Sequence, residues 1–248
     1  MHELAIIGGS GLSRMPNLHI VGREVVRTPY GEPSAPLTLG VLGDRNIWFL
    51  PRHGPDHGIP PHRVNYRANL WALRQVGARK IIGVAAVGGI RADLGPLTLA
   101  VPDQIIDYTH ERQHSFFDQI QSPVVHIDFT HPYCEELRQG LLGAAHNLGE
   151  PMVAGCTYGA TQGPRLETAA EIRRMERDGC DLVGMTGMPE AALARELDLC
   201  YACCALVVNW AAGKSAGVIS LEGIEGNLNL GMDKVRRLLG QFVIQFSP

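Results

Sequence analysis

The chain has 248 residues, of which 45% are hydrophobic and 19% charged, with a formal charge of −3. This length can bury a substantial core, and we expect residues 1–248 to form a single domain. The near-neutral charge provides no basic surface for nucleic acid or an anionic membrane, and no apolar run is long enough to span a bilayer. The amino terminus enters a strand-like run without a signal-peptide pattern, which predicts a cytoplasmic protein.

Strand-like and helix-like segments alternate along the chain without an obvious repeat or a low-complexity linker. Apolar runs predict strands at residues 4–7, 37–41, 47–50, 80–87, 97–106 (one or two strands), 152–158, 181–184 and 199–208. Apolar residues at helical spacing predict helices at residues 65–76, 133–148, 169–177, around 191–193 and from about 229. This alternation predicts an α/β fold.

Cysteine and histidine are the residues that could indicate a metal or redox site. Cys200 and Cys203 form a CxxC pattern, but it lies in an apolar run without a second CxxC. On a strand these two side chains would point to opposite faces, so we expect the six cysteines to be small buried apolar residues. The histidines of residues 107–132 are irregularly spaced, and no metal site is expected there. A loop of this length is typically functional or part of an interface.

Two polar segments in the first quarter of the chain could bind an anion. Gly9 and Ser10 follow the first predicted strand, where glycine lets backbone N–H groups approach a ligand and Ser adds a hydroxyl donor. Arg52 and His53 follow the strand at residues 47–50, and a guanidinium matches phosphate geometry. The alternatives are a structural turn for the first segment and a surface Arg beside a core His for the second.

The apolar run at residues 205–208 ends abruptly at Asn209, followed by a turn through Trp210. Ligand sites of α/β proteins lie at the carboxyl ends of such strands, so Asn209 is placed to meet a substrate. It could instead cap the strand and bond the local backbone. Glu167, at a helix entry, could serve a ligand or only favour the helix dipole.

Taken together, the motifs of this chain resemble those of the methylthioadenosine phosphorylase branch of the purine nucleoside phosphorylases, in the same order and over essentially its whole length. These motifs are Gly8-Gly9-Ser10-Gly11-Leu12, Thr28-Pro29-Tyr30-Gly31, Arg52-His53-Gly54, Val64-Asn65-Tyr66, Glu111-Arg112-x-x-Ser115-Phe116, Gly163-Pro164-Arg165 and Met185-Thr186. The resemblance implies a single α/β domain with a central mixed sheet flanked by helices, usually as a homotrimer. It also implies a pentosyltransferase for which inorganic phosphate is a co-substrate, with no other cofactor or metal.

The resemblance assigns roles to individual positions. Those expected to bind phosphate are Ser10, Arg52, His53, Thr186 and the backbone of Ala86, while Ala85 stands where relatives often carry a Thr. Those expected to contact the nucleoside are Met185, Leu166, Glu167, Asn209, Trp210, Ala211 and His126, the last reaching across a subunit interface towards the 5′ end. His53 and Asn209 are the expected catalytic residues.

Glu167 and Asn209 match the hypoxanthine- and guanine-cleaving relatives, because adenine-specific relatives carry a small residue and an Asp at these positions. Hypoxanthine presents an N1–H donor and acceptors at O6 and N7, which suit the Glu167 carboxylate and the Asn209 amide. Adenine would instead turn a lone pair towards the carboxylate, a mismatch of about 1–3 kcal/mol. Asn209 could also stabilise charge on the departing purine.

The segment after Asn209 decides the 5′ group of the substrate. Ordinary 6-oxopurine phosphorylases place a His here, whereas residues 218–226 contain none. Leu221, Gly223 and Ile224 are the expected specificity positions of an apolar pocket, to which Val218 could also belong, suited to a methylthio group. We therefore expect phosphorolysis of 5′-methylthioinosine. The alternatives are a methylthioadenosine phosphorylase, a general 6-oxopurine phosphorylase, a nucleoside hydrolase and a non-catalytic nucleoside sensor.

Overall fold

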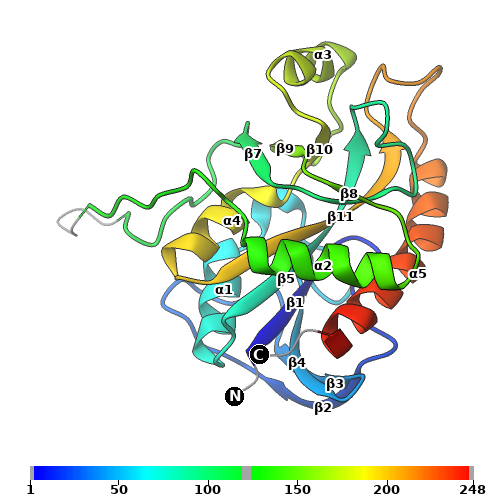
Figure 1. Cartoon of the computed structure of the whole chain (residues 1–248). Coiled ribbons are helices and arrows are strands. Elements are labelled where there is room, and N and C mark those ends of the chain that lie inside the picture. Colours follow the sequence, from blue (N-terminus) through cyan, green and yellow to red (C-terminus); the bar gives the residue numbers. More distant parts are fainter. Residues whose placement is uncertain (1–2, 119–123, 246–248) are drawn as a thin grey trace.

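The computed structural model describes residues 3–118 and 124–245, whose strands form one eleven-stranded mixed sheet with helices on both faces (Figure 1). The predicted α/β class and central mixed sheet are confirmed. One path through the sheet runs β2 (His19–Glu24), β3 (Leu37–Leu42), β4 (Arg45–Pro51), β1 (Leu4–Gly8), β5 (Lys80–Gly89), β10 (Leu182–Gly184), β9 (Thr157–Ala160) and β7 (Gln104–Asp107). A branch adds β11 (Cys200–Trp210), β6 (Leu99–Val101) and β8 (Met152–Ala154). The helices are α1 (Tyr66–Gln75), α2 (Glu135–Asn147), α3 (Ala169–Arg177), α4 (Gly187–Glu196) and α5 (Leu221–Gln245), with a 3-10 turn at Pro61–Arg63.

The long strand β11 divides its side chains between two hydrophobic cores. Ala205 and Val207 pack with residues of α1 and α4, whereas Cys204 and Leu206 pack with residues of α2 and α5. This alternation follows from the two-residue period of a strand. Because both faces are covered, the strand reads as a continuous apolar run in the sequence.

Strand β5 is paired with a neighbouring strand along almost all of one edge, whereas the pairing along its other edge is interrupted in the middle. β11 pairs with it in parallel over almost its whole length. On the other edge, β1 pairs with residues 80–83 and β10 pairs with residues 88–89. The intervening stretch, which includes Ala85 and Ala86, is therefore left to face a cavity.

Several predicted boundaries were wrong for identifiable reasons. Helix α5 begins at Leu221 rather than near residue 229, because Gly223 and Gly226 lower the helix propensity of its first turns. The strand predicted at residues 152–158 is divided into β8 and β9 around Gly155, whose φ is 75°. Strand β11 continues through Trp210 across a bulge instead of turning there. The edge strand β2 was not predicted.

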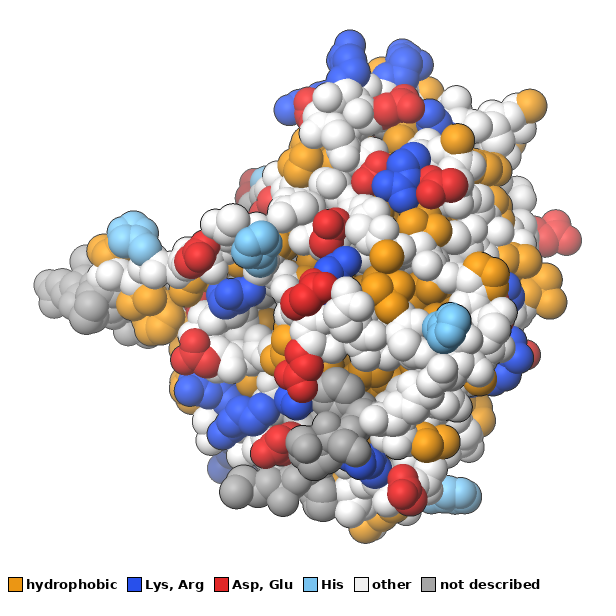
Figure 2. Space-filling view, viewed as in Figure 1, with side chains coloured by type: hydrophobic (Ala, Val, Ile, Leu, Met, Phe, Trp, Pro, Cys, Tyr) orange, Lys and Arg blue, Asp and Glu red, His pale blue; other side chains and the backbone are white. Residues whose placement is uncertain are grey.

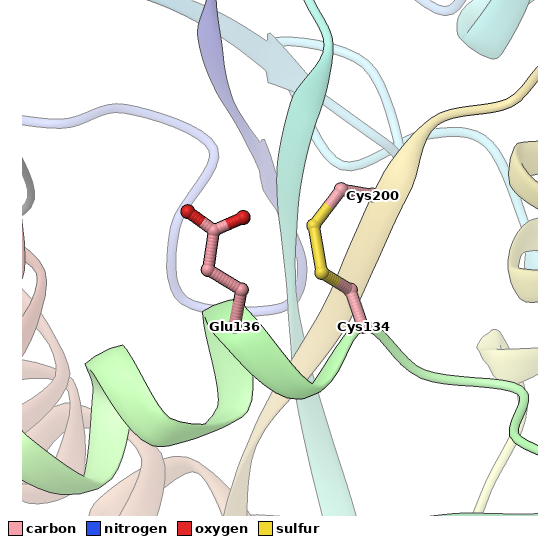
Figure 3. Close-up of side chains that lie close together, drawn as sticks. All are labelled: Cys134, Glu136 and Cys200. Carbon is pink, nitrogen blue, oxygen red and sulfur yellow. A yellow bond between two sulfur atoms is a disulfide. The ribbon is translucent and has the colours of Figure 1, made fainter. Parts of the chain in front are cut away.

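A disulfide between Cys134 and Cys200 corrects the prediction that all six cysteines are unpaired apolar residues. Figure 3 shows that it joins the start of α2 to β11, with Glu136 nearby. These three residues have the composition of a small metal-ligand group. However, the two sulfur atoms are bonded to each other, and Glu136 accepts a hydrogen bond from Lys80 at 2.8 Å. The remaining cysteines are buried and free: Cys156, Cys180, Cys203 and Cys204.

Helix α5, at 25 residues, is long enough to be considered as a membrane span. Neither it nor any other helix in the described residues has the sustained apolar character that crossing a bilayer requires. Its buried residues lie on one face, against the sheet and α2, as expected for an amphipathic helix.

Candidate active site

A cavity of about 620 Å³ lies where the carboxyl ends of the parallel strands β1, β4, β5 and β11 meet. This edge of an α/β sheet is the usual ligand site. Most of the residues predicted from the sequence line the cavity: Ser10, Arg52, His53, Ala86, Leu166, Glu167, Met185, Thr186, Asn209, Ala211, Leu221 and Ile224. The structure brings together residues that are as much as 214 positions apart (Ser10 and Ile224), whereas their individual roles remain predictions.

The glycine-rich loop after β1 passes very close to β5. A Cβ atom on Gly9 would lie 2.4 Å from the carbonyl oxygen of Val84, so a side chain cannot be accommodated there without moving the backbone. This approach places Ser10 at the cavity wall, where its Oγ lies 3.4 Å from His57 Nε2. The glycines are thus needed for close backbone packing, and Ser10 is available to a ligand.

Arg52 is held at the floor of the cavity by a buried ion pair with Glu190 of α4. Its Nε and Nη2 each donate to Glu190 at 2.7 Å, and Nη1 donates to Val84 O at 2.8 Å. Tyr201 donates a further hydrogen bond to Glu190 at 2.7 Å. Burial alone would lower the pKa of Arg52, but the Glu190 carboxylate outweighs it and raises the pKa. The remaining N–H groups of Nη1 and Nη2 are free to bind an anion.

Glu190 was missed by the sequence analysis, although a signal for it exists. It stands in the mostly apolar stretch of residues 187–194, and the side chain is only 1% exposed. A glutamate is almost never fully buried unless it is paired. A carboxylate in an apolar helix therefore indicates a buried basic partner, but only the tertiary structure identifies that partner as Arg52.

His53 is a neutral, buried histidine next to Arg52. Its Nδ1 lies 2.8 Å from Ile59 O, and because a carbonyl only accepts, Nδ1 carries the proton and Nε2 is the acceptor. Burial and the Arg52 charge lower the pKa of His53 from 6.5 to about 4. Burial also lowers the pKa of His57, whose ring lies 4.7 Å from that of His53 and which the sequence analysis did not assign to the site. Both rings line the cavity.

Glu167 lies at another part of the wall, in the loop that precedes α3. The helix is capped without it, since Thr168 and Glu171 form a complete capping box. The carboxylate of Glu167 instead accepts a hydrogen bond from Thr161 Oγ1 at 2.6 Å. The alternative that Glu167 only favours the helix dipole is thus not supported by its contacts. Thr161 was not expected from the sequence.

Asn209 lies one residue before the end of β11, just after the bulge, and its side chain is half-buried at the cavity. Its Nδ2 donates to Trp210 O at 2.7 Å, which is the local backbone bond considered as an alternative role. An amide nitrogen carries two hydrogens, so the second remains available. The local bond fixes the orientation of the amide and is compatible with a ligand contact.

Three predicted site residues do not line the cavity of their own chain: Trp210, Gly223 and His126. The Trp210 ring packs towards Gly95, because the bulge turns Asn209 and Ala211 to the cavity instead. Gly223 is exposed in the first turn of α5, where its N–H donates to Ser220 Oγ. His126 is exposed on the segment between β7 and α2.

The wall formed by the start of α5 is apolar. Leu221 and Ile224 line it as predicted, and the structure adds Ile219 and Leu228, whereas Val218 is 95% exposed and does not line the cavity. Leu221 itself is 73% exposed, so this wall is partly open. The helical spacing of Leu221, Ile224 and Leu228 was concealed by the late predicted start of α5.

A buried arginine links the two loops that border the cavity. Arg112 donates to Met185 O at 2.8 Å, to Met188 O at 2.6 Å and to Thr161 O at 3.0 Å. It belongs to a motif recognised in the sequence, but its position was not predictable. These bonds fix the backbone of Met185 and the loop that carries Glu167.

Comparison with known proteins identifies the family of this chain. Residues 3–244 match the Phosphorylase superfamily, and the chain belongs to this family. A relative from Pseudomonas syringae pv. tomato, named probable S-methyl-5′-thioinosine phosphorylase, is 54% identical over 97% of this chain and 98% of its own length. A 6-oxopurine nucleoside phosphorylase from Pyrococcus furiosus is 50% identical over 87% of this chain and 82% of its own length.

The fold also matches solved structures. A methylthioadenosine phosphorylase from Schistosoma mansoni in complex with adenine superimposes with a TM-score of 0.94 and 34% identity. The match covers 99% of this chain and 92% of that one. The sequence-based assignment to the phosphorylase family and its fold is therefore confirmed.

Proposed function

We propose that this nucleoside phosphorylase converts S-methyl-5′-thioinosine and phosphate into hypoxanthine and 5-methylthioribose 1-phosphate. The observation that carries the proposal is that one cavity combines Glu167 and Asn209 with the apolar start of α5. The first pair suits a 6-oxopurine, and the apolar wall suits a methylthio group. Relatives named probable S-methyl-5′-thioinosine phosphorylase, at 54% and 51% identity, support the same substrate.

In the proposed mechanism, phosphate lies between Ser10, Arg52 and Thr186 and attacks C1′ of the sugar. The N9–C1′ bond breaks with its electrons passing to the purine, while the sugar gains oxocarbenium character that the phosphate anion stabilises. The new bond joins C1′ to a phosphate oxygen, and the proton lost by the hydrogen phosphate passes through solvent to the departing purine, which leaves as hypoxanthine. The neutral His53 can accept a hydrogen bond at Nε2 from a protonated phosphate oxygen. The second Nδ2 hydrogen of Asn209 can donate to N7 or O6 as charge develops there.

We also propose a homotrimer, as the family resemblance implies. The described residues of the segment between β7 and α2 project from the body of the chain, and Figure 2 shows hydrophobic side chains among them. Phe117, Val124 and Val125 are exposed there, as is His126, which would reach a neighbouring cavity. Light scattering after size exclusion tests the assembly. A monomer with full activity would contradict this proposal. The cytoplasmic location and single-domain organisation stay predictions.

The substrate is tested by measuring purine release from methylthioinosine, inosine and methylthioadenosine, each with and without phosphate. We expect phosphate-dependent release that is fastest from methylthioinosine. Equal release without phosphate would identify a hydrolase, and binding without release would identify a sensor. Preference for inosine would favour the second candidate, a general 6-oxopurine nucleoside phosphorylase, which the Pyrococcus furiosus relative supports.

A further inference from the structure

A second cavity, of about 710 Å³, adjoins the nucleoside cavity at Glu167, which lines both. The second cavity is also lined by Arg165, Glu171 and Arg174. Arg165 is paired with Glu171 at 2.7 Å, and this bond is the main cause of the raised pKa of Arg165.

Thr161 contacts Glu167 from the second cavity. It directly follows β9, is 7% exposed and lines only the second cavity. Its N–H donates to Gly184 O at 2.8 Å, and its carbonyl accepts from Arg112 at 3.0 Å. The backbone of Thr161 is thus fixed on both sides, unlike an exposed loop residue.

The hydroxyl of Thr161 has one hydrogen to donate. It lies 2.6 Å from Glu167 Oε1 and 3.3 Å from Gly184 O, and the shorter contact to the charged group is the stronger bond. This engages Oε1, and among the described residues no hydrogen bond to Oε2 is present, so that oxygen can accept from a ligand donor. A hypoxanthine N1–H supplies such a donor, whereas adenine N1 does not.

We infer that Thr161 is a positioning residue that supports recognition of the 6-oxopurine by fixing the orientation of the Glu167 carboxylate, which lines the nucleoside cavity. This inference rests on the proposed function, because it assigns Glu167 to the base. Thr161 does not touch the substrate and acts only through Glu167. Its hydroxyl, rather than its volume, carries the effect.

The test compares T161V, which removes the hydroxyl at constant volume, with T161S, which retains it. We expect T161V to lower kcat/KM for methylthioinosine about 10- to 100-fold, the effect of losing a hydrogen bond to a charged group. The KM for phosphate should stay within about twofold of the original, and T161S should restore most of the activity. T157V, at the start of the same strand, is the matched control and should behave like the unaltered enzyme. If T161V does not fold, T161A is expected to give the same loss.

A double-mutant cycle with E167A, which removes the acceptor of the Thr161 hydroxyl, separates positioning from a general structural role. We expect T161V to have little further effect when Glu167 is already replaced. Additive effects, an unchanged kcat/KM in T161V, or an equal loss in T161S would overturn the inference. The proposed function fails separately, if the unaltered enzyme itself prefers methylthioadenosine.

Discussion

Arg52 and Glu190 form a two-point ion pair in which both side chains are only 1% exposed. The pair connects the cavity floor to α4, and Tyr201 of β11 completes the bonding of the carboxylate. Breaking a buried pair by removing one partner leaves an unpaired charge. The orientation of Arg52, which is predicted to bind phosphate, therefore depends on a residue that does not line the cavity.

Replacement of Glu190 by Gln is expected to lower the free energy of unfolding by about 3–5 kcal/mol, the cost of an unpaired buried charge. It should also raise the KM for phosphate, because the guanidinium loses its fixed orientation. Added phosphate should recover part of the stability by supplying the missing negative charge. Urea unfolding with and without phosphate measures both effects. The exposed pair of Glu136 with Lys80 provides the control, since E136Q should cost less than about 1 kcal/mol.

The lowered pKa of His53 predicts a loss of stability in acid. The folded pKa is about 4 and the unfolded value 6.5, so between these values the unfolded chain binds the extra proton. The contribution is fully present above pH 6.5 and is lost as the pH falls towards 4, by up to about 3 kcal/mol. H53N, which can keep the bond to Ile59 O but does not titrate, should flatten this part of the profile. Identical profiles from pH 7 to 5 would contradict the assignment.

Exchange of Asn209 for Asp tests the proposed base recognition. A carboxylate cannot donate to N7 or O6 unless it is protonated, so we expect kcat/KM for methylthioinosine to fall about 100-fold. Activity on methylthioadenosine should fall much less, raising its relative selectivity at least about tenfold. Steady-state kinetics on both nucleosides at saturating phosphate decide this. An unchanged ratio would exclude a role for Asn209 in selecting the base.

A histidine in the apolar wall should shift the preference of the enzyme from a 5′-methylthio group towards the 5′-hydroxyl group of the nucleoside. I224H introduces a hydrogen-bonding group next to the predicted 5′ pocket and removes apolar surface. We expect the ratio of kcat/KM for inosine over methylthioinosine to rise about tenfold. V218H is the matched control, because Val218 lies in the same segment but outside the cavity. Equal changes in both variants would show that the effect is not local.

The disulfide between Cys134 and Cys200 closes a loop with a sequence separation of 66 residues. Removing it should lower the free energy of unfolding by about 2–4 kcal/mol, since the unfolded chain regains entropy. A variant with both cysteines replaced by Ser should unfold at lower denaturant and should not respond to reductant. If dithiothreitol shifts the unaltered protein no more than this variant, the disulfide does not contribute to stability.

Much of the fold follows from local patterns in the sequence. The apolar run of β11 and the helical spacing in α1 and α2 predicted these elements, because burial of a strand or a helix face requires a regular period. Arg52 and Asn209 were identified as site candidates because each directly follows or ends an apolar strand run, and ligand sites of α/β proteins lie at the carboxyl ends of strands. Their convergence follows from the parallel pairing of β1, β4, β5 and β11.

Other features depend on contacts between distant segments, which no local period encodes. The partner of Glu190 lies 138 residues away, the partner of Cys134 lies 66 residues away, and Arg112 reaches Thr161 across 49 residues. The start of α5 was hidden because glycines weaken its local signal while packing against the sheet stabilises the helix. By itself, the sequence determined the α/β class and most of the polar residues at the strand ends. The tertiary structure decided which of them face one cavity, and which buried side chains hold them there.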